Sequence, residues 1–288
     1  MEELICYTPY AIIILPKLSF DDTGNLKEFA CIGMAIEPML KVHTKKSSEF
    51  KIKDLEGENF MELLNSLKNY FNLEAVEIEI NELDKINSIN YISAIVLACS
   101  ISYLWINKIR NIYETINLID ELLFKNKLYL GISHILFNGG MNLYSKNETS
   151  ILFHRLPFIN MNWNLIVLEK GTYDFFDIIK DKNYRNVLAH HTNESFSIIQ
   201  NDFTLSKIYE ENKRIAFDAG LIDSDLYEII NLLNKAGFYA GYNYFSRGIH
   251  VLTETSRKEE AIKIIESIFE KGYVRIYNIN HSGLFLQE

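Results

Sequence analysis

The sequence contains little glycine, proline, cysteine or tryptophan. Its 288 residues include 13 glycines, 4 prolines, 3 cysteines and 2 tryptophans. The cysteines, Cys6, Cys31 and Cys99, lie in apolar surroundings and show no C-x-x-C spacing. This pattern argues against a disulfide framework and a cysteine-based zinc site, and it indicates buried thiols in a reducing compartment.

Positive charge is also in short supply. The chain has 29 lysines and arginines against 38 aspartates and glutamates, a net charge of -9. Duplex nucleic acid is held by clustered basic side chains, so we expect no duplex nucleic-acid partner. The chain opens with Glu2 and Glu3 and lacks the basic segment of a secretory signal, which predicts a cytoplasmic protein.

No apolar run is long enough to cross a bilayer. The most apolar helix-length stretch covers residues 92–106 and is interrupted only by Ser93, Ser100 and Ser102. A transmembrane helix needs about 20 predominantly apolar residues. We therefore expect a buried helix and no membrane partner.

What is present is a globular composition, with 48% hydrophobic and 23% charged residues. Hydrophobic periodicity predicts an α+β fold. The expected strands cover 4–18, 30–36, 40–46, 50–54, 77–80, two stretches within 149–168, two flanking a loop within 238–253, and 273–279. The expected helices cover 59–71, 92–106, 109–124, 184–201, 206–219, 224–236 (with Ser224 as N-cap and Gly237 at C′) and 257–270. A polar turn near 145–155 predicts two domains, residues 1–150 and 151–288.

Residues 87–93 enter the apolar helix, where an anion-binding fold places a glycine-rich loop. Amides at a helix N-terminus attract phosphate. This loop contains no glycine, and its polar residues are Asn87, Ser88, Asn90 and Ser93. We treat these four as a degenerate phosphate loop and expect weak or no binding of ATP, because side chains obstruct the approach of phosphate to the backbone.

Four parts of the chain carry recognisable motif patterns: Thr23-Gly24 with residues 32–38, residues 131–134 with 138–140, residues 156–158 with 163–168, and residues 236–252. They resemble motifs of the GHMP kinase superfamily, and in particular those of beta-ribofuranosylaminobenzene 5'-phosphate synthase-like proteins. The resemblance implies a two-domain GHMP-kinase-like fold with mixed, largely antiparallel sheets covered by helices. It also implies a transferase that acts on a small molecule, with a phosphorylated donor and Mg as the cofactors to test.

The departures from these motifs are specific. Residues 29–33 lack an acid and two glycines of the family pattern, and residues 241–248 replace its G-Q-S-S-W-G-P loop. The aspartate that GHMP kinases carry falls at Ser133. These losses leave the fold inference intact and weaken the interpretation as an ordinary ATP kinase.

Phosphoryl or phosphoribosyl transfer needs positive charge, aimed donors and a group that orients the nucleophile. His134 could be a base or a phosphate ligand, and the alternative is a structural histidine. Lys17 could be a substrate-facing cation, although a solvated lysine at a strand end is favoured. Ser133, beside His134, joins the candidate substrate-binding residues.

The richest polar cluster on an expected loop contains Asn243, Ser246, Arg247 and His250. Arginine suits bidentate recognition of phosphate or carboxylate, so we predict that Arg247 is the main anion contact. The alternative is a surface loop whose arginine forms an ion pair.

His190 and His191 precede Glu194, but H-H-T-N-E matches no metal motif. We interpret this segment as a solvated helix N-terminus, and the sequence predicts no metal site.

Three functions remain open. The first is a synthase-like transferase that moves a phosphoribosyl or phosphoryl group to a small carboxylate-bearing substrate. The second is a divergent small-molecule kinase, such as an archaeal mevalonate-phosphate kinase. The third is a non-catalytic protein that binds a metabolite or pairs with an active paralogue. The expected partners are a small phosphorylated or carboxylated molecule and a second subunit in a homodimer or heterodimer.

Overall fold

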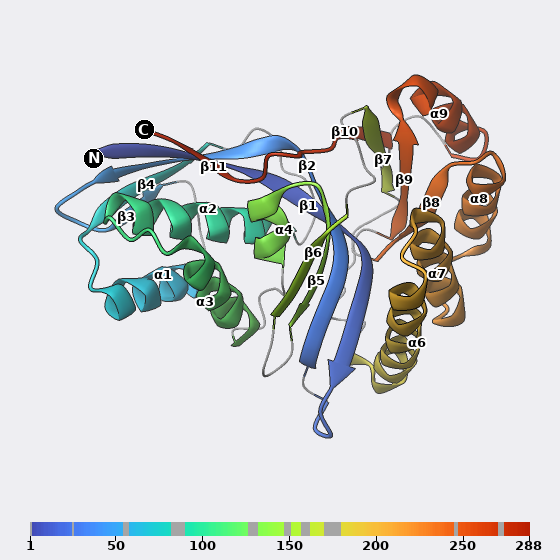
Figure 1. Cartoon of the computed structure of the whole chain (residues 1–288), viewed down its shortest axis with the longest axis horizontal. Helices are drawn as coiled ribbons and strands as arrows, with labels where there is room; N and C mark the ends of the chain where they lie inside the picture. The colour runs from blue at the N-terminus through green and yellow to red at the C-terminus, as the bar shows by residue number, and fades with distance from the viewer. Residues whose placement is uncertain are drawn as a thin grey trace. The chain divides into compact units, whose positions relative to one another are not determined.

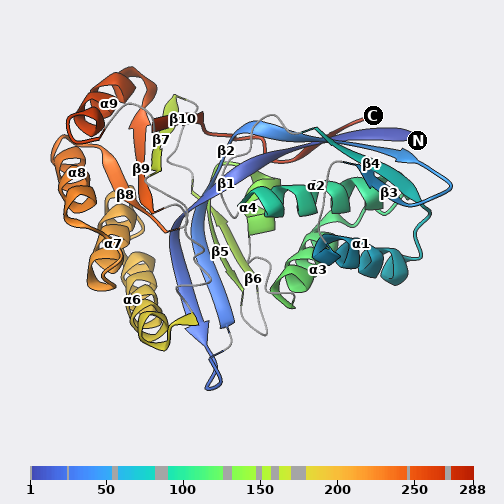
Figure 2. The same cartoon turned by 180° about the vertical axis from the view of Figure 1, so that it is seen from behind.

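The computed structural model describes residues 2–24, 26–53, 58–81, 90–125, 132–146, 151–156, 162–169, 180–244, 247–269 and 274–288. The chain forms two compact units (Figures 1 and 2). Unit 1 comprises Met1–Ala11, Ala35–Gly140 and Asn280–Glu288, and unit 2 comprises Ile12–Met34 and Met141–Ile279. The division into domains 1–150 and 151–288 stays a prediction.

Two long strands, β1 (Glu3–Phe20) and β2 (Leu26–Lys46), contribute to both units. The two strands expected at 30–36 and 40–46 form one continuous strand, β2, so their separation is wrong. The physical reason lies in its partners. Residues 29–34 pair with β5 (Met141–Lys146), and residues 41–46 pair with β4 (Val76–Asn81). Pro38, which has no amide hydrogen to donate, lies between these two ladders.

Unit 1 combines a sheet with helices on one face (Figure 1). Along the chain its other elements are β3 (Lys51–Lys53), α1 (Glu58–Phe71), α2 (Asn90–Ile106), α3 (Ile112–Lys125), α4 (Ile132–Asn138) and β11 (Phe285–Gln287). The strand order is β11-β1-β2-β4-β3. β3 and β4 are parallel and are joined through α1, whereas β11 pairs with β1 and β4 pairs with β2 in antiparallel ladders.

α2 is the buried helix that its composition predicts, and this expectation is confirmed. It contains no charged residue, and all of residues 93–104 are buried. Its serines include Ser102, whose hydroxyl donates to the carbonyl of Ala98 and so needs no other partner. Among the described residues, no helix has both the length and the hydropathy that crossing a membrane demands.

Unit 2 contains a four-stranded antiparallel sheet in the order β10-β7-β9-β8. Its remaining elements are β6 (Ile151–Arg155), β7 (Trp163–Glu169), α6 (Lys182–Asn201), α7 (Leu205–Asp218), α8 (Ser224–Lys235), β8 (Tyr239–Asn243), β9 (Gly248–Glu254), the 3₁₀ turn η1 (Thr255–Arg257), α9 (Lys258–Glu266) and β10 (Val274–Asn278). β6 pairs with β5, which pairs with β2. The α+β expectation is confirmed.

Side-chain caps explain where the helices of unit 2 begin. Asp181 caps α6, Thr204 caps α7 and Asp223 caps α8, each by accepting a hydrogen bond from an amide in the first turn. The predicted N-cap of α8, Ser224, is therefore wrong by one residue. Gly237 has φ +86 directly after the C-cap, which confirms its expected position.

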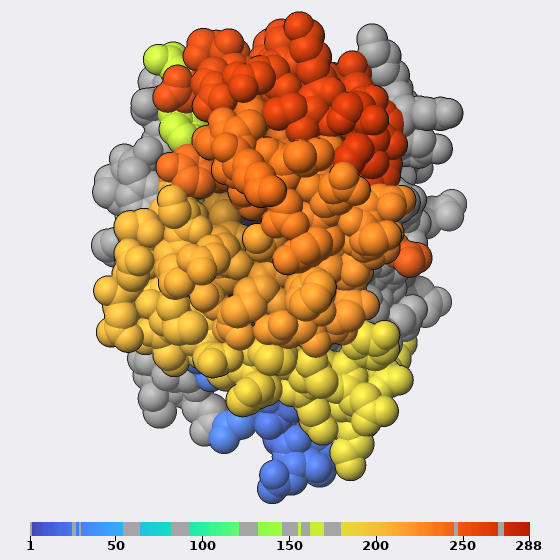
Figure 3. Space-filling view, turned by 90° about the vertical axis from the view of Figure 1, so that its right-hand side faces the viewer, coloured from blue at the N-terminus to red at the C-terminus, as the bar shows by residue number. Residues whose placement is uncertain are grey.

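Helices α6, α7, α8 and α9 occupy one face of unit 2, and Figure 3 shows them together in yellow to red. The turn between β1 and β2 lies beside the start of α6. Arg185 donates to the carbonyl of Gly24, with 3.3 Å between the heavy atoms, and its guanidinium lies 5.5 Å from the ring centre of Phe20. These contacts attach the β1–β2 turn to the helical layer.

The backbone turns tightly at Gly139 and Gly140, directly after α4 in unit 1. Both residues have positive φ, +67 and +73. A Cβ at Gly139 would collide with the backbone at Gly283, so glycine is the residue that fits here. The amide of Gly140 then donates to the carbonyl of Asn280. This close approach attaches the end of α4 to the C-terminal segment.

Candidate functional site

The first part of the candidate site lies in unit 1, where α4 contacts both α2 and α3. The amide of Glu74, just before β4, donates to Asn107, which follows α2. The C-terminal end of α2 therefore lies toward β3 and β4, and Figures 1 and 2 show α4 at its opposite end. The N-terminal turns of α2 are thus next to the short helix that carries Ser133 and His134.

Buried hydroxyls mark this end of unit 1. Ser93 in the first turn of α2 and Ser133 in the first turn of α4 are both fully buried. Neither Oγ has a hydrogen-bond partner among the described residues. A buried hydroxyl without a partner costs free energy, and a ligand oxygen could provide the missing bond.

Of the other three residues of the predicted phosphate loop, the structure describes one. Asn90 is the first residue of α2. Asn87 and Ser88 lie outside the described residues. The expectation of a degenerate phosphate loop that binds ATP weakly or not at all therefore stays a prediction.

His134 lies in the interior of unit 1, only 4% exposed. Its Nε2 is 2.9 Å from Oδ1 of Asn117 and 3.8 Å from Oδ2 of Asp120, both on α3. The bond to the amide oxygen of Asn117 makes Nε2 the protonated nitrogen in the neutral ring. These contacts hold the ring in one orientation.

Lys17 has a partner that the sequence analysis did not identify. Its Nζ lies 2.8 Å from Oε1 of Glu28, and the two side chains are 21% and 22% exposed. Lys17 is on β1 and Glu28 is on β2, both within unit 2. It is thus a partly buried, paired lysine inside a strand, not a solvated lysine at a strand end.

The predicted polar loop of unit 2 is shorter than expected. Asn243 ends β8 and is 5% exposed, and Arg247 is exposed with φ +47. Ser246 lies outside the described residues. A Cβ at Gly248 would overlap the carbonyl oxygen of Leu168, so glycine is required where β9 begins beside β7.

His250 belongs to strand β9 and not to the loop. It pairs with Gly241 of β8 and Val167 of β7, and its side chain is fully buried. Its ring stands edge-on to Tyr209 of α7, with 5.3 Å between the ring centres. Burial lowers the pKa of His250 to about 3, because desolvation outweighs the opposing effect of nearby backbone carbonyls. It is therefore neutral at physiological pH.

Comparisons with known proteins reveal the fold. No family model and no curated protein match the sequence. Solved structures do match over almost the whole chain. A phosphotransferase related to the CoA biosynthesis pathway is 14% identical with a TM-score of 0.79, covering 99% of this chain and 98% of that one. This is a GHMP-kinase-like fold.

Two further solved structures match the whole chain. Mevalonate diphosphate decarboxylase from Staphylococcus aureus is 11% identical with a TM-score of 0.73, covering 100% of this chain and 98% of that one. Homoserine kinase from Cytophaga hutchinsonii is 13% identical with a TM-score of 0.69, with the same coverage. A similar structure is a complex with AMPPCP and magnesium. The two-domain fold class expected from the motifs is confirmed.

In this fold, the candidate residues divide between the units. Ser93, Ser133 and His134 belong to unit 1, where α2, α3 and α4 bring them to one region. Lys17, Asn243, Arg247 and His250 belong to unit 2. The sequence analysis missed Asn117 and Asp120, whose position beside His134 arises from helix packing. Their spacing of three residues on a helix was the signal that could have found them.

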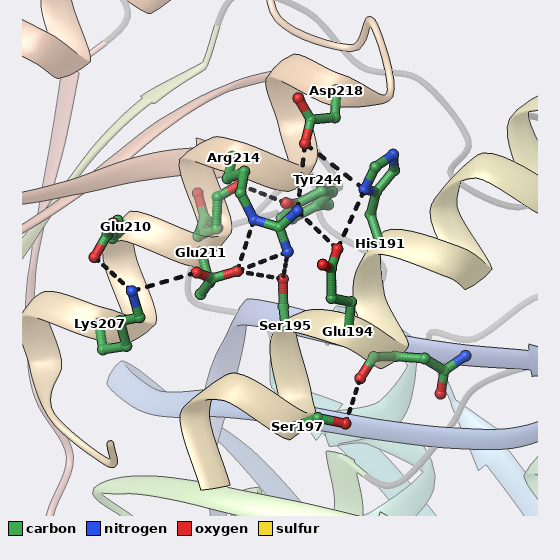
Figure 4. Close-up of polar contacts among 12 residues, drawn as sticks. His191, Glu194, Ser195, Ser197, Lys207, Glu210, Glu211, Arg214, Asp218 and Tyr244 are labelled. Carbon is green, nitrogen blue, oxygen red and sulfur yellow. Dashed lines mark hydrogen bonds and ion pairs between the residues drawn. The ribbon is translucent and has the colours of Figure 1, made fainter. Parts of the chain in front are cut away.

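The sequence analysis also missed a charged cluster between α6 and α7, shown in Figure 4. At its centre is Arg214, with contacts of 2.8 Å to Glu211, 3.0 Å to Glu194 and 3.4 Å to Asp218. Ser195 donates to Glu211 over 2.7 Å.

His191 lies in the middle of α6, so its interpretation as part of a solvated helix N-terminus is wrong. The helix begins nine residues earlier, at Lys182, because Asp181 caps it there.

A second missed residue is Asn212 of α7, which is fully buried. Its side chain accepts from the amide of Tyr242 over 2.6 Å and donates to the carbonyl of Tyr242 over 3.0 Å. It also donates to the carbonyl of Ile14 on β1. One amide side chain therefore connects α7, β8 and β1 within unit 2.

Proposed function

We propose that the protein transfers a phosphoryl group to a small carboxylate-bearing molecule. The observation that carries this proposal is the whole-length likeness to solved structures named for a phosphotransferase and a homoserine kinase. That likeness establishes the fold, and fold alone does not define a reaction. The local chemistry of α2, α3 and α4 supports the proposal independently.

In this proposal the phosphate groups approach the N-terminal end of α2. Free amides and the helix dipole favour negative charge at such an end. Ser93 and Ser133 have buried hydroxyls that can donate to phosphate oxygens. His134, held by Asn117, is the proposed group that would contact the transferred group or the attacking hydroxyl.

Magnesium is the metal that this fold implies for a nucleotide donor, and the residues present offer a partial fit. Mg²⁺ is usually held by one or two carboxylates together with substrate phosphates. Asp120, 2% exposed and next to His134, supplies a carboxylate in the described part of this region. A magnesium ion there would offset phosphate charge, while Ser93 and Ser133 would orient the phosphate oxygens.

Within unit 2, Arg247 is the proposed contact for an anionic group, a carboxylate or a phosphate. It is exposed on the turn after β8, and its guanidinium can form two parallel bonds to an oxyanion. Lys17, by contrast, is already paired with Glu28, so we give it only an indirect electrostatic role.

The phosphorylated donor distinguishes a synthase-like enzyme from a divergent kinase. A synthase resembling beta-ribofuranosylaminobenzene 5'-phosphate synthase would take phosphoribosyl pyrophosphate, whereas a divergent kinase would take ATP. A thermal-shift panel with ATP and magnesium, phosphoribosyl pyrophosphate, and phosphorylated small acids tests both, because binding to the folded state raises its apparent stability. Phosphorus NMR of the same mixtures, supplemented with small hydroxy acids, then detects group transfer.

The second candidate is a non-catalytic metabolite-binding protein or partner subunit. It is favoured by the lack of glycine in residues 87–93 and by a serine in place of an acid at Ser133. This candidate predicts a thermal shift without transfer. Transfer that is lost in Ser133→Ala and His134→Ala would support the enzyme, and the absence of both a shift and transfer across the panel would contradict both candidates.

A further inference from the structure

Two histidines and a glutamate gather on one side of α6. His190 and Glu194 are four residues apart and His191 and Glu194 are three apart, so all three share a face of the helix. One ligand atom from each lies within 4.8 Å of the others. Asp218, at the end of α7, extends the group, because its Oδ2 is 3.6 Å from Nδ1 of His191.

The Nδ1 atom of His191 lies beside two carboxylates. This atom is buried from solvent and has no hydrogen-bond partner among the described residues. It faces the carboxylates of Glu194, at 3.9 Å, and Asp218, at 3.6 Å (Figure 4). Both separations are too long for hydrogen bonds. Ligand atoms around a tetrahedral ion with bonds of about 2.1 Å are about 3.4 Å apart, so these separations suit ligands of one metal ion.

The surrounding charges also favour a cation. Carboxylates of Glu194, Glu211 and Asp218 surround Arg214, whose single positive charge cannot neutralise all three. Lys207 is 3.6 Å from Glu211 and 3.0 Å from Glu210, so it offsets charge on the far side of the cluster. Negative charge therefore remains beside His191.

We propose that His190, His191 and Glu194 of α6, together with Asp218 of α7, bind a divalent transition-metal ion, with Zn²⁺ as the reference ion. Imidazole nitrogens select zinc, cobalt or nickel over magnesium and calcium, which prefer oxygen alone. The ion would join the middle of α6 to the end of α7. It is separate from any magnesium used with a phosphate donor, and it does not depend on the proposed reaction.

The guanidinium of Arg214 competes with a metal ion for the carboxylates of this site. Its Nη1 contacts both Glu194 and Asp218, so binding of an ion requires these carboxylates to turn partly away from the guanidinium. Glu194 is 51% exposed and has room to do so. Removing the positive charge at Arg214 should strengthen metal binding, an effect that a purely structural ion-pair cluster would not produce.

The test is a calorimetric titration of the tag-free, chelator-treated full chain with ZnCl₂, followed by Co²⁺ absorption spectroscopy. We expect one equivalent of metal and a rise in melting temperature with Zn²⁺. His191→Ala and Glu194→Gln should weaken binding by at least roughly tenfold, in line with losses at metal-site residues. Arg214→Gln should strengthen it.

His43→Ala is the matched control, because His43 also lies near a glutamate, 3.3 Å from Glu3, and is partly exposed. It should bind zinc like the parent. Glu194→Gln protects the test against misfolding, since this exposed side chain contributes little to the core, and metal-free melting curves verify the fold of each variant. The proposal is overturned if zinc does not bind with one-to-one stoichiometry, or if His191→Ala, Glu194→Gln and His43→Ala bind it equally.

Discussion

Helix α2 and the α6–α7 pair are stabilised in opposite ways. α2 has no charged side chain, and residues 93–104 are buried. α6 and α7 place Glu194, Glu211 and Arg214 at their mutual boundary, with exposure from 51% at Glu194 to 3% at Glu211. The apolar helix is stabilised by non-directional packing against apolar neighbours, whereas the α6–α7 pair is stabilised by specific ion pairs and hydrogen bonds. A substitution in each region should therefore fail for a different physical reason.

Truncation in α2 should have the largest effect. Leu97 is fully buried, and Leu97→Ala removes apolar contacts and leaves a cavity. We expect a loss of about 3 kcal/mol in the free energy of unfolding, measured by urea denaturation. Leu232→Ala on α8 is the matched control, because Leu232 is 39% exposed, and it should cost less than about 1 kcal/mol. Equal losses would contradict the burial that distinguishes α2.

Removal of the positive charge of Arg214 should have the second-largest effect on the free energy of unfolding. Arg214→Ala leaves Glu211, 2% exposed, with Ser195 and the more distant Lys207 as its described partners. Breaking a buried pair typically costs about 3–5 kcal/mol, and we expect about 2 kcal/mol here because Arg214 is 29% exposed and Lys207 remains. Urea denaturation measures it. Arg257→Ala, which breaks an exposed pair with Glu260, should cost clearly less, and equal costs would contradict the special position of Glu211.

The third prediction concerns ligand binding at the β8–β9 turn. Arg247→Ala should weaken binding of a phosphorylated small acid such as 3-phosphoglycerate by roughly ten- to a hundredfold. Folding stability should change little, because Arg247 is exposed and alanine meets the same backbone strain at φ +47. Calorimetry measures affinity, and Arg247→Lys should recover only part of it. Unchanged affinity in Arg247→Ala would refute the proposed contact.

The last prediction concerns the pH dependence of folding stability that His250 causes. Its folded-state pKa of about 3 lies below the unfolded value near 6.5, so the unfolded chain binds a proton that the folded chain does not. Stability should fall by about 1.4 kcal/mol per pH unit as the pH drops between these values. His250→Gln should remove this slope, whereas His43→Gln, at a partly exposed residue, should keep it. Urea denaturation at pH 7 and pH 5 checks both.

Local features of the chain could be predicted from the sequence, whereas contacts between distant residues could not. The burial of residues 92–106 could be predicted because apolar composition is a local property of the chain. The candidates Ser133 and His134 came from a motif, whereas the contact of His134 with α3 did not, because Asn117 reaches His134 from another helix. The loop around Arg247 was located, but the extent of β9 was not, since pairing with β7 determines that His250 lies in a strand.

The sequence by itself determined the α+β class, most helix boundaries, the buried α2 and the GHMP-like order of elements, because periodicity, caps and turn residues act over a few positions. Tertiary structure decided the continuity of β2 through Pro38, the neutral state of His250, and the approach of both His191 and Arg214 to Asp218. Each of these depends on groups brought together from distant parts of the chain. Desolvation, strand pairing and charge interactions arise only once those groups are in contact.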